Sequence, residues 1–357
     1  RMHSAPHALS GGGAAGAALA ALGVDCAGPP PPAAAVLTRA GRTWPLPATP
    51  LALLRHPLLP LRARLQALGF FAAVARGPLP PPDQTLDGWL AERGTAPELG
   101  DLVRALVRLS TYCPQSEVLS AAVAVDQLRR AMAGVRYVHG GWGAIVDRLA
   151  DRARRAGVVL RTGVGVRTLT VGGAGSRLAT AEGEMLAARQ VVLAVAPERA
   201  RSLLGSAAAP DFVRFVEGAR PMTAACLDVG LRTAPGPGPR PEIGLALDLD
   251  APRYLGWHSV ADDLAPPGGV LLQLAHYGED PGAARDGLER WLDGLQPGWR
   301  EAAIMTRWLP AVRVCEYLPA ATSGGLAGRP GVCGAGPANV FLCGDWVGPE
   351  GLLSDRS

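Results

Sequence analysis

The stretch NVFLCGDWVGPEG, residues 339–351, joins a short apolar run to a glycine and an acid. NVFLC contains no charge and no proline, which is typical of a strand in the interior of a parallel or mixed sheet. Gly344 and Asp345 follow at once, so a carboxylate is expected at the carboxyl end of that strand, where α/β sheets bind ligands. An aspartate that only caps a following helix explains the same residues equally well.

A second segment with ligand-binding character is YVHGGWGAIVDRLA, residues 137–150. Gly140, Gly141 and Gly143 remove side chains from a stretch that opens a helix. Backbone N–H groups are therefore available to an anionic or polar ligand. Taken alone, the segment is explained more simply as a tight turn that leads into a helix.

The opening of the chain contains GGGAAG (11–16), which matches G-x-G-x-x-G letter for letter. A dinucleotide-binding turn of this kind needs a buried strand before the first glycine and an acid about 20 residues later. RMHSAPHALS (1–10) has no apolar β-rich run, and Asp25 comes too early with no strand leading into it. The sequence therefore predicts a loop that feeds a helix over 17–22, which Gly23 ends.

The remaining patterns predict a mixed α/β protein. Short helices broken at Pro57 and Pro60 are expected first, then helices over 84–134. An amphipathic helix is expected over 143–157, with an apolar stripe of Ile145, Val146, Leu149 and Ala153. The expected strands are VVLRT (158–162), VRTLTV (166–171), VVLAV (191–195), MTAACLDV (222–229), GLALDL (244–249), GVLLQLAH (269–276) and AAIMTRW (302–308).

Together, the segments 137–150 and 339–351 resemble one family. It is the FAD-dependent oxidoreductase superfamily of phytoene and carotenoid desaturases, protoporphyrinogen oxidase and amine oxidases, with the desaturase-like branch closest. Y-x-x-GG-x-G-x-(I/L)-V-x-x-L-A is similar to that family's mid-chain flavin-domain helix. VVLAVAP (191–197) and PAVRVCEYLPA (310–320) stand where the family has comparable segments. The resemblance covers most of the chain and is specific only in these blocks.

The resemblance implies FAD as the cofactor and a role for individual residues. Asp345 would accept hydrogen bonds from the ribityl chain, and Gly344 would let the backbone approach the cofactor. Val166 would present its backbone to the adenine. The cofactor-binding set implied in this way is Gly140, Gly141, Val166, Gly344, Asp345 and Trp346.

The fold that the resemblance implies is α/β, with a discontinuous Rossmann-like FAD-binding domain interleaved with a substrate domain of mixed sheet plus helices. The implied segments are 1–40 (remnant of the FAD-domain start), 41–135 (helical part of the substrate domain), 136–205 (middle FAD-binding segment), 206–318 (substrate-domain sheet) and 319–357 (C-terminal FAD-binding segment). The family opens with a βαβ unit that bears the true glycine motif, and it continues past the GD motif. We therefore expect an internal fragment that is truncated at both ends.

Composition excludes several classes of function. The net charge is +4, from 35 basic and 31 acidic residues with no basic cluster, which argues against nucleic acid as a partner. The six cysteines are scattered without a C-x-x-C pair, which predicts no metal site and fits reduced thiols in a cytoplasmic protein. The chain contains no lysine, so a Schiff base, a lysine base and a pyridoxal phosphate anchor are excluded.

The function expected from the resemblance is FAD-dependent dehydrogenation of a small apolar substrate by hydride transfer to the flavin. The sequence identifies no catalytic residue, because Tyr137, His139, His258 and His276 are candidates by residue type alone. The alternative is a non-catalytic binding or scaffold protein that keeps the flavoprotein fold without a functional nucleotide motif. The sequence leaves the oligomeric state open.

The segment 44–75 is apolar, interrupted by prolines and dotted with arginines. Such a segment suits a peripheral membrane surface that admits an apolar substrate. A lid packed on its own domain explains it as well, so both interpretations stay open.

Overall fold

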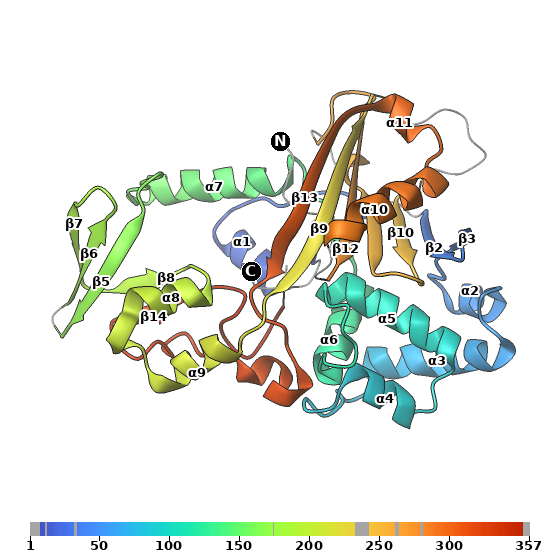
Figure 1. Ribbon diagram of the computed structural model, residues 1–357, viewed down its shortest axis with the longest axis horizontal. Helices are drawn as coiled ribbons and strands as arrows, with labels where there is room; N and C mark the ends of the chain where they lie inside the picture. The colour runs from blue at the N-terminus through green and yellow to red at the C-terminus, as the bar shows by residue number, and fades with distance from the viewer. Residues whose placement is uncertain are drawn as a thin grey trace.

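The computed structural model describes residues 8–10, 13–31, 34–173, 175–232, 243–260, 264–278 and 281–352. Figure 1 shows an elongated molecule in which a large sheet and a group of helices make up one end. A small three-stranded sheet and several separate helices make up the other end. Within the described ranges, no helix combines the length and the apolar character needed to cross a bilayer.

A seven-stranded mixed sheet forms the centre of the larger end (Figure 1). Its strand order is β13-β9-β12-β11-β10-β2-β3, and every neighbouring pair is antiparallel except β10 with β2. The strands are β2 Ala35–Arg39, β3 Arg42–Pro45, β9 Met222–Leu231, β10 Leu245–Asp248, β11 Arg253–Trp257, β12 Val270–Tyr277 and β13 Ala303–Cys315. The sheet thus combines a strand pair from the first 45 residues with five strands from 222–315.

Helices cover both faces of this sheet because the side chains of its central strands alternate between two cores. Along β9, Ala224 and Cys226 face the helices from the first half of the chain, whereas Leu227 and Val229 face α10. The helices are α2 Pro50–Arg55, α3 Leu61–Arg76, α4 Leu86–Glu92, α5 Pro97–Thr111, α6 Ala121–Met132, α10 Pro281–Leu295 and α11 Trp299–Ala302. Both faces of the sheet are therefore buried.

The smaller end contains the three-stranded sheet β5-β6-β7 and the parallel pair β14-β8. Its strands are β5 Val166–Gly172, β6 Gly175–Thr180, β7 Met185–Ala188, β8 Val191–Leu193 and β14 Val340–Leu342. Its helices are α7 Gly141–Arg155, α8 Pro197–Leu204 and α9 Pro210–Gly218. Short 3-10 turns complete the described chain at Gly205–Ala207, His258–Val260, Ala321–Ser323 and Gly325–Gly328. The mixed α/β fold class predicted from the sequence is confirmed.

The N-terminal glycine motif leads into helix α1 (Ala14–Ala21), which begins three residues earlier than predicted. Gly23 follows the helix in the left-handed conformation, as expected. A two-residue strand that the sequence did not predict, β1 (Leu9–Ser10), precedes the motif and pairs antiparallel with β4 (Val135–Arg136). Gly11 and Gly12 lie outside the described residues.

Three local predictions were wrong. Residues 158–162 form no strand, and Val159 is 82% exposed there. Val146 lies on the exposed side of α7, while Ile145 is the buried residue of the predicted stripe. The strand predicted over 191–195 ends at Leu193, because only that part pairs with β14.

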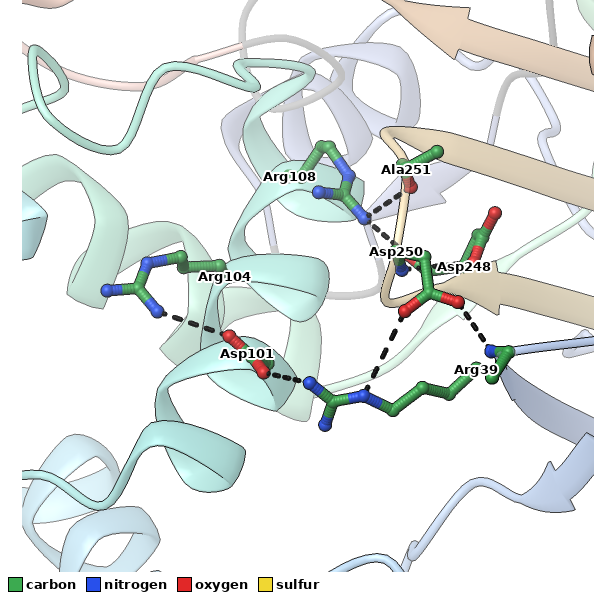
Figure 2. Close-up of polar contacts among 8 residues, drawn as sticks. Arg39, Asp101, Arg104, Arg108, Asp248, Asp250 and Ala251 are labelled. Carbon is green, nitrogen blue, oxygen red and sulfur yellow. Dashed lines mark hydrogen bonds and ion pairs between the residues drawn. The ribbon is translucent and has the colours of Figure 1, made fainter.

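Figure 2 shows how the β10–β11 turn is fastened to α5 and β2. Arg108 donates from Nη2 to the carbonyl oxygens of Asp248 (2.6 Å) and Ala251 (3.2 Å). Arg39 pairs with Asp101 on α5 at 2.6 Å, and its Nε lies 3.9 Å from an Asp250 carboxylate oxygen. These contacts therefore join α5 to β2 and to the β10–β11 turn.

A close backbone approach at Gly28 generates the first prediction. The chain at 27–29 runs beside 137–139, with Tyr137 N–H donating to Pro29 O at 2.8 Å. A Cβ on Gly28 would lie 1.6 Å from the Tyr137 carbonyl oxygen. We expect Gly28→Ala to lower the free energy of unfolding by about 3 kcal/mol, measured by urea denaturation.

The matched control is Gly69→Ala inside α3, where an added Cβ meets nothing within 4 Å. Because alanine favours helix more than glycine does, this variant should gain up to about 1 kcal/mol. Equal stability of the two variants would contradict the close approach at Gly28.

Candidate functional site

The end of β14 positions Gly344 and Asp345 beside the parallel strand β8. Gly344 has φ +154°, and a Cβ there would lie 2.7 Å from Trp346 Nε1, so the position requires glycine. The half-buried Asp345 carboxylate accepts a hydrogen bond from the Glu316 backbone N–H at 2.9 Å. It follows that Asp345 links the β14 loop to the chain that leaves β13.

Arg329 fixes the loop 345–351 through hydrogen bonds to backbone carbonyl oxygens. The residue is only 6% exposed, and its guanidinium donates to the carbonyl oxygens of Asp345, Glu350 (3.1 Å) and Gly351 (2.7 Å). These contacts satisfy a buried charge with fixed backbone acceptors. The loop 345–351 is therefore held in one conformation at the end of β14. The sequence alone gave no indication that Arg329 has this role.

Trp346 lies in the hydrophobic core of the smaller end. Its side chain is 1% exposed, and its ring centroid is 5.9 Å from those of Phe212 and Phe215. Its Nε1 donates to the Val195 carbonyl oxygen at 3.2 Å. A cofactor could contact this residue only through its backbone, because protein atoms cover the ring.

The start of α7 has the form that the glycines at 140–143 predicted. Gly140 and Gly141 both take left-handed φ angles, 69° and 70°. No side chain caps the helix, and its first turn contains no acid. The N-terminal end of the α7 dipole is therefore not neutralised by a capping or first-turn side chain, which favours a nearby anionic group.

Val166 begins β5, where it pairs with Thr180 on β6, and its carbonyl oxygen accepts a hydrogen bond from Arg199. The predicted cofactor-binding residues thus lie at three places: the β14 end, the α7 start and the β5 start. Figure 1 shows α7 on one side of α1, with β8 and β14 on the other.

A buried tyrosine–histidine cluster lies where the glycine segment meets the seven-stranded sheet. The Tyr137 ring centroid is 4.4 Å from that of His258, and Tyr137 is hydrogen-bonded to Tyr254. The Tyr254 hydroxyl is 3.3 Å from His258 Nε2. A Cβ on Gly256 would lie 2.2 Å from the Tyr254 hydroxyl, so the glycine makes room for this arrangement. Sequence reasoning named Tyr137 and His258 by residue type only and missed Tyr254.

A second tyrosine pair lies on the same face of the sheet. Tyr112 follows α5 in a left-handed conformation (φ 60°), and its ring stacks on Tyr277 with centroids 5.7 Å apart. Burial raises the pKa of Tyr112 and of Tyr137 to about 12, and it raises the pKa of the Cys226 thiol to about 12 as well. These side chains are therefore neutral at physiological pH.

Asp228, a buried carboxylate on this face, is compensated by its neighbours. Arg307 Nε lies 2.8 Å from Asp228 Oδ2, and Gln273 donates to Oδ1 at 2.9 Å. Asp228 is 0% exposed, so this pairing removes the cost of burying an isolated charge. The Asp228–Arg307 pair therefore adds no net charge to this aromatic face.

Comparison with known proteins identifies the family. The family model described as flavin containing amine oxidoreductase matches residues 40–352. The chain belongs to that family. A search of curated proteins finds no match.

Solved structures share the fold of this family member. An oxidoreductase from Methanosarcina mazei has a TM-score of 0.75 at 16% identity, with 98% of this chain and 85% of that chain covered. A redesigned putrescine oxidase has a TM-score of 0.70 at 13% identity, covering 98% and 84%. Cyclohexylamine oxidase from Brevibacterium oxydans has a TM-score of 0.66 at 16% identity, covering 98% and 83%.

FAD-dependent oxidoreduction is accordingly the chemistry of this flavin amine oxidoreductase, and FAD is its cofactor, as predicted. The residues present fit that group, because the start of α7 has no capping side chain and no first-turn acid and so suits the anionic part of FAD. The desaturase-like branch stays a prediction, as do the individual roles of Gly140, Gly141, Val166, Gly344, Asp345 and Trp346.

The tyrosines yield a pH prediction. Burial raises the pKa of all five of them: Tyr112, Tyr137, Tyr254, Tyr277 and Tyr317. Above about pH 10 the unfolded chain loses phenolic protons that the folded protein keeps, so the free energy of unfolding must fall as the pH rises. We expect the tyrosines of the folded protein to titrate at higher pH than those of the chain in guanidinium, which should titrate near pH 10. A tyrosine of the folded protein that titrates near pH 10 would contradict this.

Asp345 yields a cofactor prediction. Its carboxylate is expected to make a charge-assisted hydrogen bond to FAD, worth roughly 1.5–3 kcal/mol. Asp345→Ala should therefore lower the flavin content of the purified protein and weaken FAD binding roughly 10- to 150-fold. Absorbance at the flavin maximum and calorimetric titration measure the two effects.

Two further variants separate binding from structure. Asp345→Asn keeps an acceptor oxygen for the Glu316 N–H, so it should lose flavin affinity while retaining more stability than Asp345→Ala. Asp211→Ala removes an acid whose side chain is 88% exposed on α9 and should leave flavin content unchanged. Wild-type flavin occupancy in Asp345→Ala would remove this residue from the site.

Proposed function

We propose that this flavin amine oxidoreductase dehydrogenates a small apolar substrate, introducing a double bond, at the face of the seven-stranded sheet that carries Tyr254 and Tyr277. The observation that carries the proposal is the neutral aromatic cluster beside the glycine segment. Burial raises the pKa of Tyr254 and of Tyr277 well above the ordinary value, so neither phenol supplies a charge to attract an ionic substrate. The absence of lysine from the chain counts against an amine oxidase that holds a water beside the flavin with a lysine.

In the proposed domain arrangement, segments 136–205 and 319–357 hold FAD, with 1–40 beside them, while 41–135 and 206–318 form the substrate part. Gly140 and Gly141 would lie near the cofactor, and the α7 start would favour its anionic portion. FAD when bound accepts two electrons with one hydrogen from the substrate as a hydride. The protein's task is to orient the substrate and exclude water.

Forming a double bond releases a second hydrogen as a proton, and this proton needs an acceptor. His258 is 2% exposed, and its Nε2 lies 3.3 Å from the Tyr254 hydroxyl. Histidine is the side chain that ordinarily changes charge near neutral pH, whereas the phenols beside it stay protonated. We therefore assign His258 as the proton acceptor, with Tyr254 and Tyr137 fixing the plane of its ring.

The test follows flavin bleaching in the FAD-loaded protein under anaerobic conditions. Apolar compounds with adjacent C–H bonds should bleach the flavin, and His258→Asn should slow bleaching roughly 100-fold or more because the proton acceptor is lost. The matched control, His276→Asn, changes a histidine on β12 of the same sheet. His276 pairs with Arg253 in the ladder and lies outside the cluster, so its loss should have little effect.

The other outcomes oppose the proposal in distinct ways. Bleaching by amines but not by apolar compounds contradicts the apolar substrate class. Bound flavin that no compound reduces, although dithionite does, indicates the non-catalytic binding protein. Equal slowing by His258→Asn and His276→Asn removes His258 from the role assigned to it.

A further inference from the structure

The charge of the chain is unevenly distributed around α2 and α3. No aspartate or glutamate occurs between Asp25 and Asp83. The same stretch carries arginines at positions Arg39, Arg42, Arg55, Arg62, Arg64 and Arg76. Arg39 is paired with acids elsewhere, whereas no acidic side chain of the described residues pairs with Arg55 or Arg76. Arg55 on α2 and Arg76 on α3 therefore carry positive charge that no acid of the described residues neutralises.

The outward face of α3 is apolar where solvent-exposed helix faces are usually polar. Its inward residues Ala63, Ala67, Phe70 and Val74 are buried against the helical layer. On the opposite side, Leu61 and Leu65 are four residues apart and 70% and 59% exposed, and Arg76 continues the same stripe.

Helix α2 also exposes one apolar and one basic side chain. Leu51 is 54% exposed and lies one turn before the exposed Arg55. Figure 1 shows α2 and α3 at the opposite end of the molecule from β5, β6 and β7. Acids resume at Asp83, just before α4, and at Asp87 in its first turn, so the stretch without acids ends where α4 begins.

We propose that this α2–α3 surface, made of Leu51, Arg55, Leu61, Leu65 and Arg76, docks on a bilayer that contains anionic phospholipid. Arginines unopposed by any acid complement the negative lipid phosphates, and each contributes attraction that salt screens. The exposed leucines can enter the boundary between headgroups and acyl chains. The contact is peripheral, and it stands independently of the substrate proposed above.

The experiment is co-sedimentation of the full chain with vesicles of phosphatidylcholine alone or mixed with phosphatidylglycerol. We expect binding to the mixed vesicles only, weakening as salt is added. Arg55→Gln with Arg76→Gln should lower the partition coefficient roughly 30-fold at low salt. Leu61→Gln with Leu65→Gln should lower it at least roughly 10-fold. All four side chains are exposed, so the melting temperatures should match wild type.

Matched controls lie on other elements. Met185→Gln changes a side chain that is 62% exposed on β7, and it should bind vesicles as the wild type does. Arg154→Gln with Arg214→Gln removes the same total charge from α7 and α9, where both side chains are at least 60% exposed. This pair should have a much smaller effect than the pair on α2 and α3.

Several results would overturn the proposal. One is absence of wild-type binding to both vesicle types, and another is equal binding to neutral and anionic vesicles. Equal loss in the α2–α3 variants and their controls would show nonspecific attraction. A wild-type dimer that Leu61→Gln with Leu65→Gln dissociates in sedimentation equilibrium, without vesicle binding, would make the surface an interface between copies.

Discussion

The position of Tyr137 is the constraint on which the candidate site depends. Its backbone N–H donates to Pro29 O, and a side chain at Gly28 would collide with its carbonyl oxygen. Its ring lies on His258, and its hydroxyl is hydrogen-bonded to Tyr254. The same residue stands three positions before the glycine that caps α7. Tyr137 therefore ties the backbone that we assign to the cofactor to the sheet that we assign to the substrate.

Local sequence patterns predicted the helices and strands that are recognisable from their own apolar composition or periodicity. The strand at 339–343 and the helix at 143–157 were identified because composition and periodicity define them without reference to the rest of the chain. The run 158–162 shows the limit of that argument. An apolar run becomes a strand only when another strand pairs with it, and among the described residues none pairs with this one. The pairing of Leu9–Ser10 with β4 could not be predicted from local patterns either, because it joins residues far apart in sequence.

The residues of the candidate site likewise fall into those with a local sequence signal and those defined only by long-range contacts. Gly344 and Asp345 could be found because a glycine and an acid directly follow a buried strand. Arg329 could not, since its contacts to the carbonyls of 345–351 exist only once the loop has folded around it. Tyr254 and His258 carried one weak signal, a phenol and an imidazole four residues apart around Gly256. A strand places Tyr254 and Gly256 on one face, but nothing local indicates that Tyr137 completes the group.

A layer of packed helices connects the surface proposed to bind the membrane with the sheet face proposed to bind the substrate. One continuous buried cluster includes Leu53 and Ala63, beneath the α2–α3 surface, together with Tyr254 and Tyr277 on the sheet. The proposed membrane face and the proposed substrate face are thus two sides of the same layer of packed helices. An apolar molecule has low solubility in water, so an enzyme that acts on one gains from taking it directly out of a bilayer. In the arrangement that we propose, the arginines on the outer side would hold the protein to the lipid, and the uncharged phenols on the inner side would impose no ionic requirement on the substrate. The two proposals are consistent with each other, because the exposed Arg55 and Arg76 lie on the outer helices while the buried phenols of Tyr254 and Tyr277 stay uncharged.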